Sequence, residues 1–152
     1  MTKGAVKTKE RRYQLWRIWN PQKPMLLFVL LNPSRADHLS NDKTVTRLIS
    51  FTKKFGYGGF YLGNICSYIS PYPSELEGRF YDKDYKNILH LRKMHQKCEK
   101  VIYGWGNHGH LPAWLKEMIP NPMCMGINKN GSPKHPLYLP LTTELLPYES
   151  GK

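Results

Sequence analysis

Polar side chains suited to binding or catalysis follow an unbroken apolar run at residues 25–31. The run ends in Asn-Pro, and the residues that come next in this loop include Asn32, Pro33, Ser34, Arg35, Asp37 and Asp42. An amide offers both a donor and an acceptor to a ligand, a carboxylate can act as a general base, and an arginine suits phosphate. The same residue types also form ordinary turns and helix caps, so a purely structural role stays open for each of them.

Three later apolar segments are also followed by polar or aromatic side chains. The residues concerned are Asn64, Tyr68, Trp105, His108 and His135. Taken singly, Asn64 could tie its loop to the backbone, and each histidine could be a solvated loop residue. The histidine spacing matches no zinc pattern, so we expect neither a metal nor a cofactor. Taken together, amide, imidazole, hydroxyl and glycine chemistry after four separate segments predicts a ligand pocket.

Strands and helices must alternate to position these residues. The hydrophobic patterns predict strands at 25–31, 60–64, 100–106 and 123–127, and helices at 43–55, 82–96 and 110–118. Asn41 or Asp42 would cap the first helix, and Asp82 or Asp84 the second. Thr44 and Arg47 fall in the first turns of the first helix, where Arg47 could pair with a carboxylate or reach a phosphate. This order predicts an α/β fold, a three-layer α/β/α sandwich with a mostly parallel central sheet. In such sheets, ligands bind beyond the carboxyl ends of the strands.

The N-terminal part of the chain predicts a β-hairpin. Residues 13–19 alternate apolar and polar side chains, and the turn sequence at 20–24 leads into the strand at 25–31. The basic residues before them, 1–12, are expected to be a flexible tail, either frayed or gripping phosphates. We therefore expect one α/β domain over 13–147, with a second tail at 148–152.

Composition and charge narrow the classes of partner. The 152 residues carry 23 Lys and Arg against 11 Asp and Glu, a formal net charge of +12. Such a balance favours nucleic acid, with DNA expected first, or a nucleotide as the partner. Three dispersed cysteines, Cys66, Cys98 and Cys124, indicate reduced thiols and a cytoplasmic location. No stretch approaches the roughly 20 apolar residues of a membrane span, and we expect a monomer.

Four blocks of this sequence resemble a bacterial and phage family known as domain of unknown function 1643. They read FVLLNPSRADHLSNDKTVTRLISF, GYGGFYLGNICSY, VIYGWGNHG and GSPKHPLYL. The resemblance runs from about Tyr13 to Leu139, and the family name implies no activity.

The order of the same blocks is similar, more distantly, to the uracil-DNA glycosylase superfamily. LLNPS stands where the superfamily has its first catalytic loop, LGN where a strand ends in asparagine, YGWGNHG where an apolar run leads into W-G-x-H, and HPLYL where an H-P-S-P loop closes the site. The resemblance implies a uracil-DNA glycosylase-like fold. Asn32 stands where the most active members have aspartate, and an amide is no general base, so Asp37 or Asp42 would replace it.

The distant resemblance also implies roles for individual residues. Asn64 would pair with a uracil-like base extruded from the stack, His135 would donate to the departing base, and Tyr68 or Tyr57 would stack on its face. The expected function is thus hydrolysis of the N-glycosidic bond of a deaminated or modified base, with DNA repair or base modification as its setting. Two alternatives stay open: a non-catalytic module that binds DNA or a nucleobase, and an enzyme of nucleotide metabolism in which Ser34, Arg35 and the helix start bind phosphate.

Overall fold

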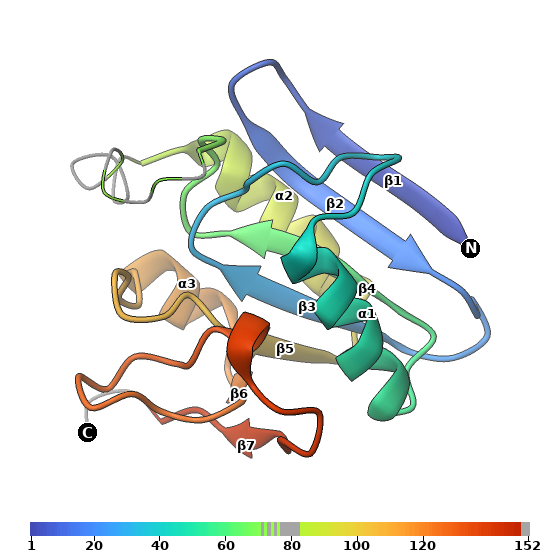
Figure 1. The fold of residues 1–152 in the computed structure, drawn as a ribbon. Coiled ribbons are helices and arrows are strands. Elements are labelled where there is room, and N and C mark those ends of the chain that lie inside the picture. The colour runs from blue at the N-terminus through green and yellow to red at the C-terminus, as the bar shows by residue number, and fades with distance from the viewer. Residues whose placement is uncertain (71, 73, 75, 77–82, 150–152) are drawn as a thin grey trace.

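The computed structural model describes residues 1–70, 72, 74, 76 and 83–149. Within these residues seven strands form one sheet in the order β1-β2-β4-β3-β5-β6-β7 (Figure 1). The strands are β1 (Thr2–Lys7), β2 (Arg12–Ile18), β3 (Met25–Leu30), β4 (Gly59–Asn64), β5 (Lys100–Tyr103), β6 (Met123–Cys124) and β7 (Leu146–Pro147). The helices are α1 (Lys43–Lys54), α2 (Tyr85–Gln96), α3 (Ala113–Met118) and the short 3-10 helix η2 (Pro136–Tyr138).

The centre of the sheet is parallel. Strand β3 pairs in parallel with β4 on one side and with β5 on the other, and β5 pairs in parallel with β6. All six residues of β3 are buried, as expected of a strand covered on both faces. The flanking pairs β1·β2, β2·β4 and β6·β7 are antiparallel. The predicted α/β class with a parallel sheet core is therefore confirmed, and antiparallel strands extend the sheet at both edges.

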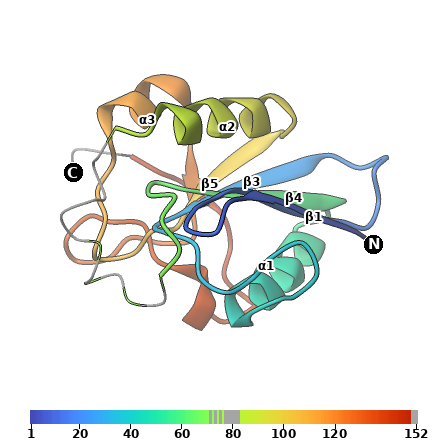
Figure 2. The same ribbon diagram turned by 90° about the horizontal axis from the view of Figure 1, so that it is seen from above.

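Helices cover both faces of the sheet. Helix α1 lies on one face, and α2 and α3 lie on the other (Figure 2). On the α1 side, Val45, Leu48 and Phe51 pack against alternate residues of β3 and β4. On the opposite side, Leu91 and Met94 of α2 and Leu115 of α3 pack with Tyr103 and Trp105. No described helix is long and apolar enough to cross a membrane.

The caps of the predicted helices are formed by acidic side chains. Asp42 caps α1 by accepting a hydrogen bond from Val45 N at 2.8 Å, and Asp84 caps α2 through Asn87 N at 3.2 Å. Asp82, the other predicted cap of α2, lies outside the described residues. Helix α1 ends before Gly56, whose φ of 84° falls in the left-handed region that glycine adopts without steric cost.

An N-terminal hairpin is present, but it joins β1 to β2 and not the strands predicted at 13–19 and 25–31. Strand β2 pairs with β1 and with β4, and β3 lies one position further into the sheet. Residues 2–7, expected to be part of a flexible tail, form β1 instead. Strand β4 reaches its place between β2 and β3 through the α1 crossover, a non-local pairing that local alternation does not encode. The sequence does not predict β1, because Gly4 is its one buried residue and the strand has no alternation of apolar and polar side chains.

Candidate functional site

The strand connections diverge at the carboxyl ends of β3 and β5. The chain leaves β3 through α1 towards β4 on one side, and it leaves β5 through α3 towards β6 on the other. Such a switch point leaves a crevice open beyond the strand ends. A pocket of about 590 Å³ lies there, within the usual size range of small-molecule sites. Its polar and aromatic lining residues are Arg12, Asn32, Ser34, Asp42, Thr44, Asn64, Ser70, Trp105, Asn107, His108, Asn128, Lys134, His135 and Tyr138.

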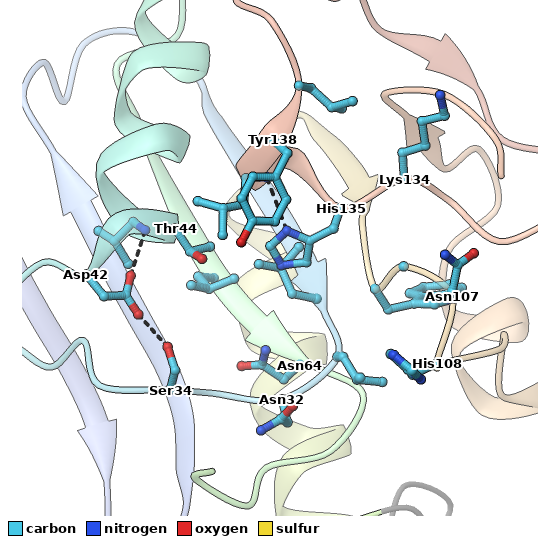
Figure 3. A pocket seen from close by; sticks show the side chains of 18 of the residues that line it. Asn32, Ser34, Asp42, Thr44, Asn64, Asn107, His108, Lys134, His135 and Tyr138 are labelled. Carbon is cyan, nitrogen blue, oxygen red and sulfur yellow. Dashed lines mark hydrogen bonds between the residues drawn. The ribbon is translucent and has the colours of Figure 1, made fainter. Parts of the chain in front are cut away.

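A carboxylate, Asp42, lies at the α1 side of this pocket (Figure 3). Its Oδ1 accepts the Val45 N–H of the first helical turn, and its Oδ2 accepts the hydroxyl of Ser34. Two hydrogen bonds leave a carboxylate with further lone pairs, because its two oxygens together offer about four acceptor positions. Asp42 therefore caps the helix and can still accept a proton or a hydrogen bond on the pocket side.

The imidazole of His135 lies across the pocket from Asp42 (Figure 3). Its Nδ1 accepts the backbone N–H of Leu137 at 3.1 Å, so the proton of the neutral ring is on Nε2. Burial lowers the pKa of His135 below its ordinary value of 6.5, although the negative charge of Asp42 opposes the shift. His135 therefore offers a neutral Nε2–H donor at neutral pH.

Asn64 contributes a buried amide at the end of β4. Its side chain is 2% exposed, and its Oδ1 has no hydrogen-bond partner among the described residues. The backbone behind it is held by Asn87 of α2, whose Nδ2 donates to the carbonyl oxygens of Asn64 at 2.8 Å and Ile65 at 3.3 Å. A buried acceptor without a donor is costly, and because Asn64 lines the pocket a ligand bound there can supply that donor.

Asn32 lies beside Asn64 on the pocket floor (Figure 3). Its Nδ2 donates to the carbonyl oxygen of Ser70 at 2.7 Å and makes longer contacts with those of Pro33 and Tyr68. The amide N–H group thus ties the two loops together. Its carbonyl oxygen is the part left to serve a ligand.

Asp37 does not line the pocket, which corrects its expected placement beside Asn32. Its Oδ1 accepts the backbone N–H groups of Leu39 and Ser40, both at 2.8 Å, and the Ser40 hydroxyl. These bonds, with that from Ser40 N foremost, hold the pKa of Asp37 well below its usual range. The carboxylate is used to close its own turn, a common role for aspartate.

Four other expected residues, Pro33, Arg35, Arg47 and Tyr68, also lie outside the pocket lining. Pro33 is buried beside it and its carbonyl accepts Ser70 N at 3.0 Å. Arg35 is exposed in a neighbouring hollow that it shares with Lys43 and with Ser34, Asp42 and Thr44. Arg47 donates from Nη2 to the Leu139 carbonyl, which ties α1 to the segment after η2.

Tyr68, expected to stack on a base, lies in a separate small hollow. The guanidinium of Arg11 lies 3.9 Å from its ring centroid, and Arg11 also pairs with Asp84 at 2.6 Å. The ring is therefore engaged by protein.

Several pocket residues were not singled out as site residues. They are Arg12, Ser70, Asn107, Asn128, Lys134 and Tyr138. Asn107 and Lys134 lie in the same polar blocks as His108 and His135, so proximity in sequence was a usable signal. No such signal pointed to Arg12, because it lies in the basic segment 1–12 that was predicted to be a flexible tail. Among the described residues no cluster of three His, Cys, Asp or Glu side chains is placed to hold a metal ion.

The pocket lies almost wholly inside a recognised sequence family. The model of the family described as Protein of unknown function (DUF1643) matches residues 12–137. The chain belongs to this family. No curated protein and no solved structure matches the chain significantly. In this DUF1643 protein the matched segment runs from Arg12 on β2 to Leu137 in η2, so it contains Asp42, Asn64 and His135.

Proposed function

We propose that the pocket binds a uracil-like base of a nucleic acid, DNA first, and hydrolyses its N-glycosidic bond. One observation supports this above the others: the Asp42 carboxylate, the Asn64 amide with its unpartnered Oδ1, and the neutral His135 donor line a single pocket. The order of the blocks that carry them, with its distant similarity to the uracil-DNA glycosylase superfamily, points the same way and extends to the fold.

Asn64 reads the base in this proposal. A uracil-like edge presents an N–H donor beside a carbonyl acceptor, and an asparagine side chain presents the complementary pair. The Asn64 Oδ1 accepts the base N3–H, which satisfies the buried oxygen that lacks a protein partner. Its Nδ2 donates to O4 of the base.

His135 stabilises the leaving base. When the bond from C1′ to the base nitrogen breaks, its electron pair goes to the base and negative charge gathers on O2. The Nε2–H of neutral His135 donates to that oxygen, and the bond from Leu137 N to Nδ1 keeps the proton on Nε2. The departing anion later takes a proton from solvent.

Asp42 activates water in the same step. The water oxygen forms a bond to C1′ while its proton passes to the carboxylate, which later returns it to solvent. Ser34, hydrogen bonded to Asp42, lies at the pocket wall where it can orient that water. Asn32 offers its carbonyl oxygen to the same water.

Specific observations also favour the two alternatives. Both oxygens of Asp42 already accept hydrogen bonds, as a helix cap in a non-catalytic base-binding module would require. Arg35 and Lys43 line the hollow next to the pocket, as a phosphate site in an enzyme of nucleotide metabolism would require.

A strand-cleavage assay separates these functions. The protein is incubated with oligonucleotides that carry uracil, 5-hydroxymethyluracil, hypoxanthine or natural bases, and abasic sites are then broken with alkali and counted. Base-dependent breaks that vanish in Asp42→Asn, Asn64→Ala and His135→Ala support glycosylase chemistry. Asp37→Asn is the matched control, because this carboxylate lies outside the pocket and its variant should keep full activity. Binding without breaks supports the base-binding module, and no breaks and no oligonucleotide binding at all moves nucleotide metabolism to the front.

A further inference from the structure

Two buried arginines on β2 face the same loop with very different surroundings. Arg17 is fully buried, and its guanidinium donates four hydrogen bonds, to Asn41 Oδ1, Trp16 O, Asp37 O and Ser40 O, at 2.6–3.0 Å. Its hydrogen-bonding groups are well occupied, and it does not line the pocket. Arg17 serves to hold the loop over 37–41 against the sheet.

Arg12 is nearly as buried, at 3% exposed, and it does line the pocket. Its Nη1 donates to the Ala36 carbonyl at 2.8 Å, while its Nε has no acceptor among the described residues. Within the described residues the single ion pair joins Arg11 to Asp84, so Arg12 has no carboxylate in direct contact. Burial lowers the pKa of Arg12 to about 10, with Asp42 opposing the shift, so the group stays charged at neutral pH.

A buried charge without a contacting counterion is costly in a folded protein. Arg12 keeps that charge beside a pocket, and the planar guanidinium is the side chain best shaped to bind two oxygens of a phosphate. The same pocket wall carries Thr44, in the first turn of α1, where backbone N–H groups and the helix dipole favour negative charge. The carboxylate of Asp42 at that turn accepts hydrogen bonds from Val45 N and Ser34 Oγ.

We propose that Arg12, with Thr44 beside it, binds a phosphate group of the ligand, so that the pocket takes a nucleotide unit rather than a free base or nucleoside. The identity of the base rests on the proposed function. The binding of a phosphate group by Arg12 does not. The phosphate is the monoester of a free nucleotide or the diester of a strand, and both present the same oxygens to Arg12.

Calorimetric titration of the whole chain tests this with four probes: 2′-deoxyuridine, dUMP, inorganic phosphate and a single-stranded trinucleotide with a central deoxyuridine. We expect wild-type protein to bind dUMP or the trinucleotide at least about tenfold more tightly than deoxyuridine, as a charged hydrogen bond is worth. Arg12→Gln should remove that advantage and leave deoxyuridine affinity unchanged. Arg12→Lys keeps the charge but loses the planar guanidinium that binds two oxygens at once. It should retain part of the preference for the phosphorylated probes.

Arg17→Gln is the matched control, since Arg17 comes from the same strand, is equally buried and contacts the same loop. It should lower the unfolding temperature but keep the preference for phosphate. Should Arg12→Gln fail to fold, the wild-type comparison of dUMP and trinucleotide with deoxyuridine still decides. Equal affinity of all three for the wild type, or a preference retained by folded Arg12→Gln, overturns the inference.

The probes also separate this inference from the proposed function. Suppose that inorganic phosphate binds the wild type but not Arg12→Gln, and that deoxyuridine does not bind. This result would contradict the proposed base recognition and would still support the phosphate site at Arg12. Tighter binding of the trinucleotide than of dUMP assigns the phosphate to a strand, and the reverse order assigns it to a free nucleotide. Both orders support the inference.

Discussion

Asn64 and Asn87 show how differently one side chain is used at the residue scale. Asn87 is 1% exposed, and its Nδ2 supports the backbone at the end of β4 through two carbonyl oxygens. Asn64 is equally buried, and neither its Oδ1 nor that of Asn87 meets a donor among the described residues. Of the two, only Asn64 lines the pocket. The first residue therefore stabilises the fold, and the second carries an unsatisfied group into the pocket.

Replacing each by the similarly sized leucine separates the two roles. Asn64→Leu should change the free energy of unfolding by less than about 1 kcal/mol, because no protein hydrogen bond to its Oδ1 is lost, and should weaken dUMP binding about 10- to 100-fold. Asn87→Leu should destabilise the protein by about 1–3 kcal/mol through the stranded carbonyl oxygens. Denaturant unfolding and calorimetry provide the two readouts, and a loss of stability in Asn64→Leu equal to that in Asn87→Leu would contradict this assignment.

The lowered pKa of His135 makes a prediction about pH. Between about pH 8 and pH 6.5 the ring stays neutral, so hydrolysis should be constant, and it should decline below that range as His135 takes up a proton. The unfolded chain takes up its proton first, because its histidine has the ordinary pKa of 6.5 and the folded one a lower pKa, so His135 should also reduce the unfolding free energy as the pH falls below about 6.5. Rate and unfolding free energy measured against pH check both effects, with His135→Gln losing the stability component. An acid limb centred above pH 6.5 would exclude a neutral donor.

The fate of the predicted site residues follows from their local geometry. Parallel strands bring their carboxyl ends to one edge of the sheet, so the residues that follow them can line one pocket. The predicted residues that do so include Asn32, Ser34, Asp42, Asn64, Trp105, His108 and His135. Asp37 lies in the same loop, but its carboxylate accepts the backbone N–H of Ser40, three positions later, and so closes its own turn. Sequence shows that a carboxylate is near the strand end, but which backbone N–H groups capture it depends on the path of the loop.

At the scale of elements, the first turn of α1 joins folding to the site, because its cap is also the pocket carboxylate. Asp42→Asn keeps a good cap and removes the charge, so stability should change by a few tenths of a kcal/mol. Hydrolysis should fall by a factor of about 10²–10⁴ if the carboxylate is the base. Asp84→Asn, at the corresponding cap of α2 and outside the pocket, is the control and should keep full activity. Unchanged hydrolysis in Asp42→Asn would reduce Asp42 to a cap.

Strand β1 provides a test of the hairpin that the sequence misassigned. A Cβ at Gly4 would lie 2.1 Å from the ring of Trp16 on β2, so Gly4→Ala must displace the indole from its place beside Tyr61. We expect a loss of about 1–3 kcal/mol in the free energy of unfolding. Val6→Ala, at an exposed position of the same strand, should stay within about 0.5 kcal/mol. An equally small effect of Gly4→Ala would show that β1 is loosely held.

The elements that sequence predicts best are those whose partners impose a clear period. Helices α1 and α2 and strands β3, β4 and β5 agree with their predicted ranges within a few residues. Strand β6 is only two residues long where five were expected. The neighbours of β2 could not be read from its own alternation, because pairing with β4 depends on the crossover through α1.

The net charge of +12 belongs to the whole molecule, and only part of it can bear on the site. Affinity for a single-stranded oligonucleotide should fall linearly with the logarithm of the salt concentration, with a slope of about 0.7 for each phosphate contacted. Arg12→Gln should reduce that slope by about 0.7. Lys100→Gln, at the amino end of β5 and thus at the opposite edge of the sheet from the pocket, should leave it unchanged. Titrations at several salt concentrations measure both slopes, and a slope that responds equally to either change would indicate diffuse attraction.

The hydrogen bond from Arg47 to the Leu139 carbonyl links α1 to the segment that carries His135 and Tyr138. The segment is thus fastened by folding itself, before any ligand arrives. A ligand then meets a pre-organised surface, and the conformational entropy of residues 135–139 is not lost a second time on binding. Affinity in such a site comes from the contacts themselves, and the rate of association is set by diffusion into the pocket and not by the closing of a loop.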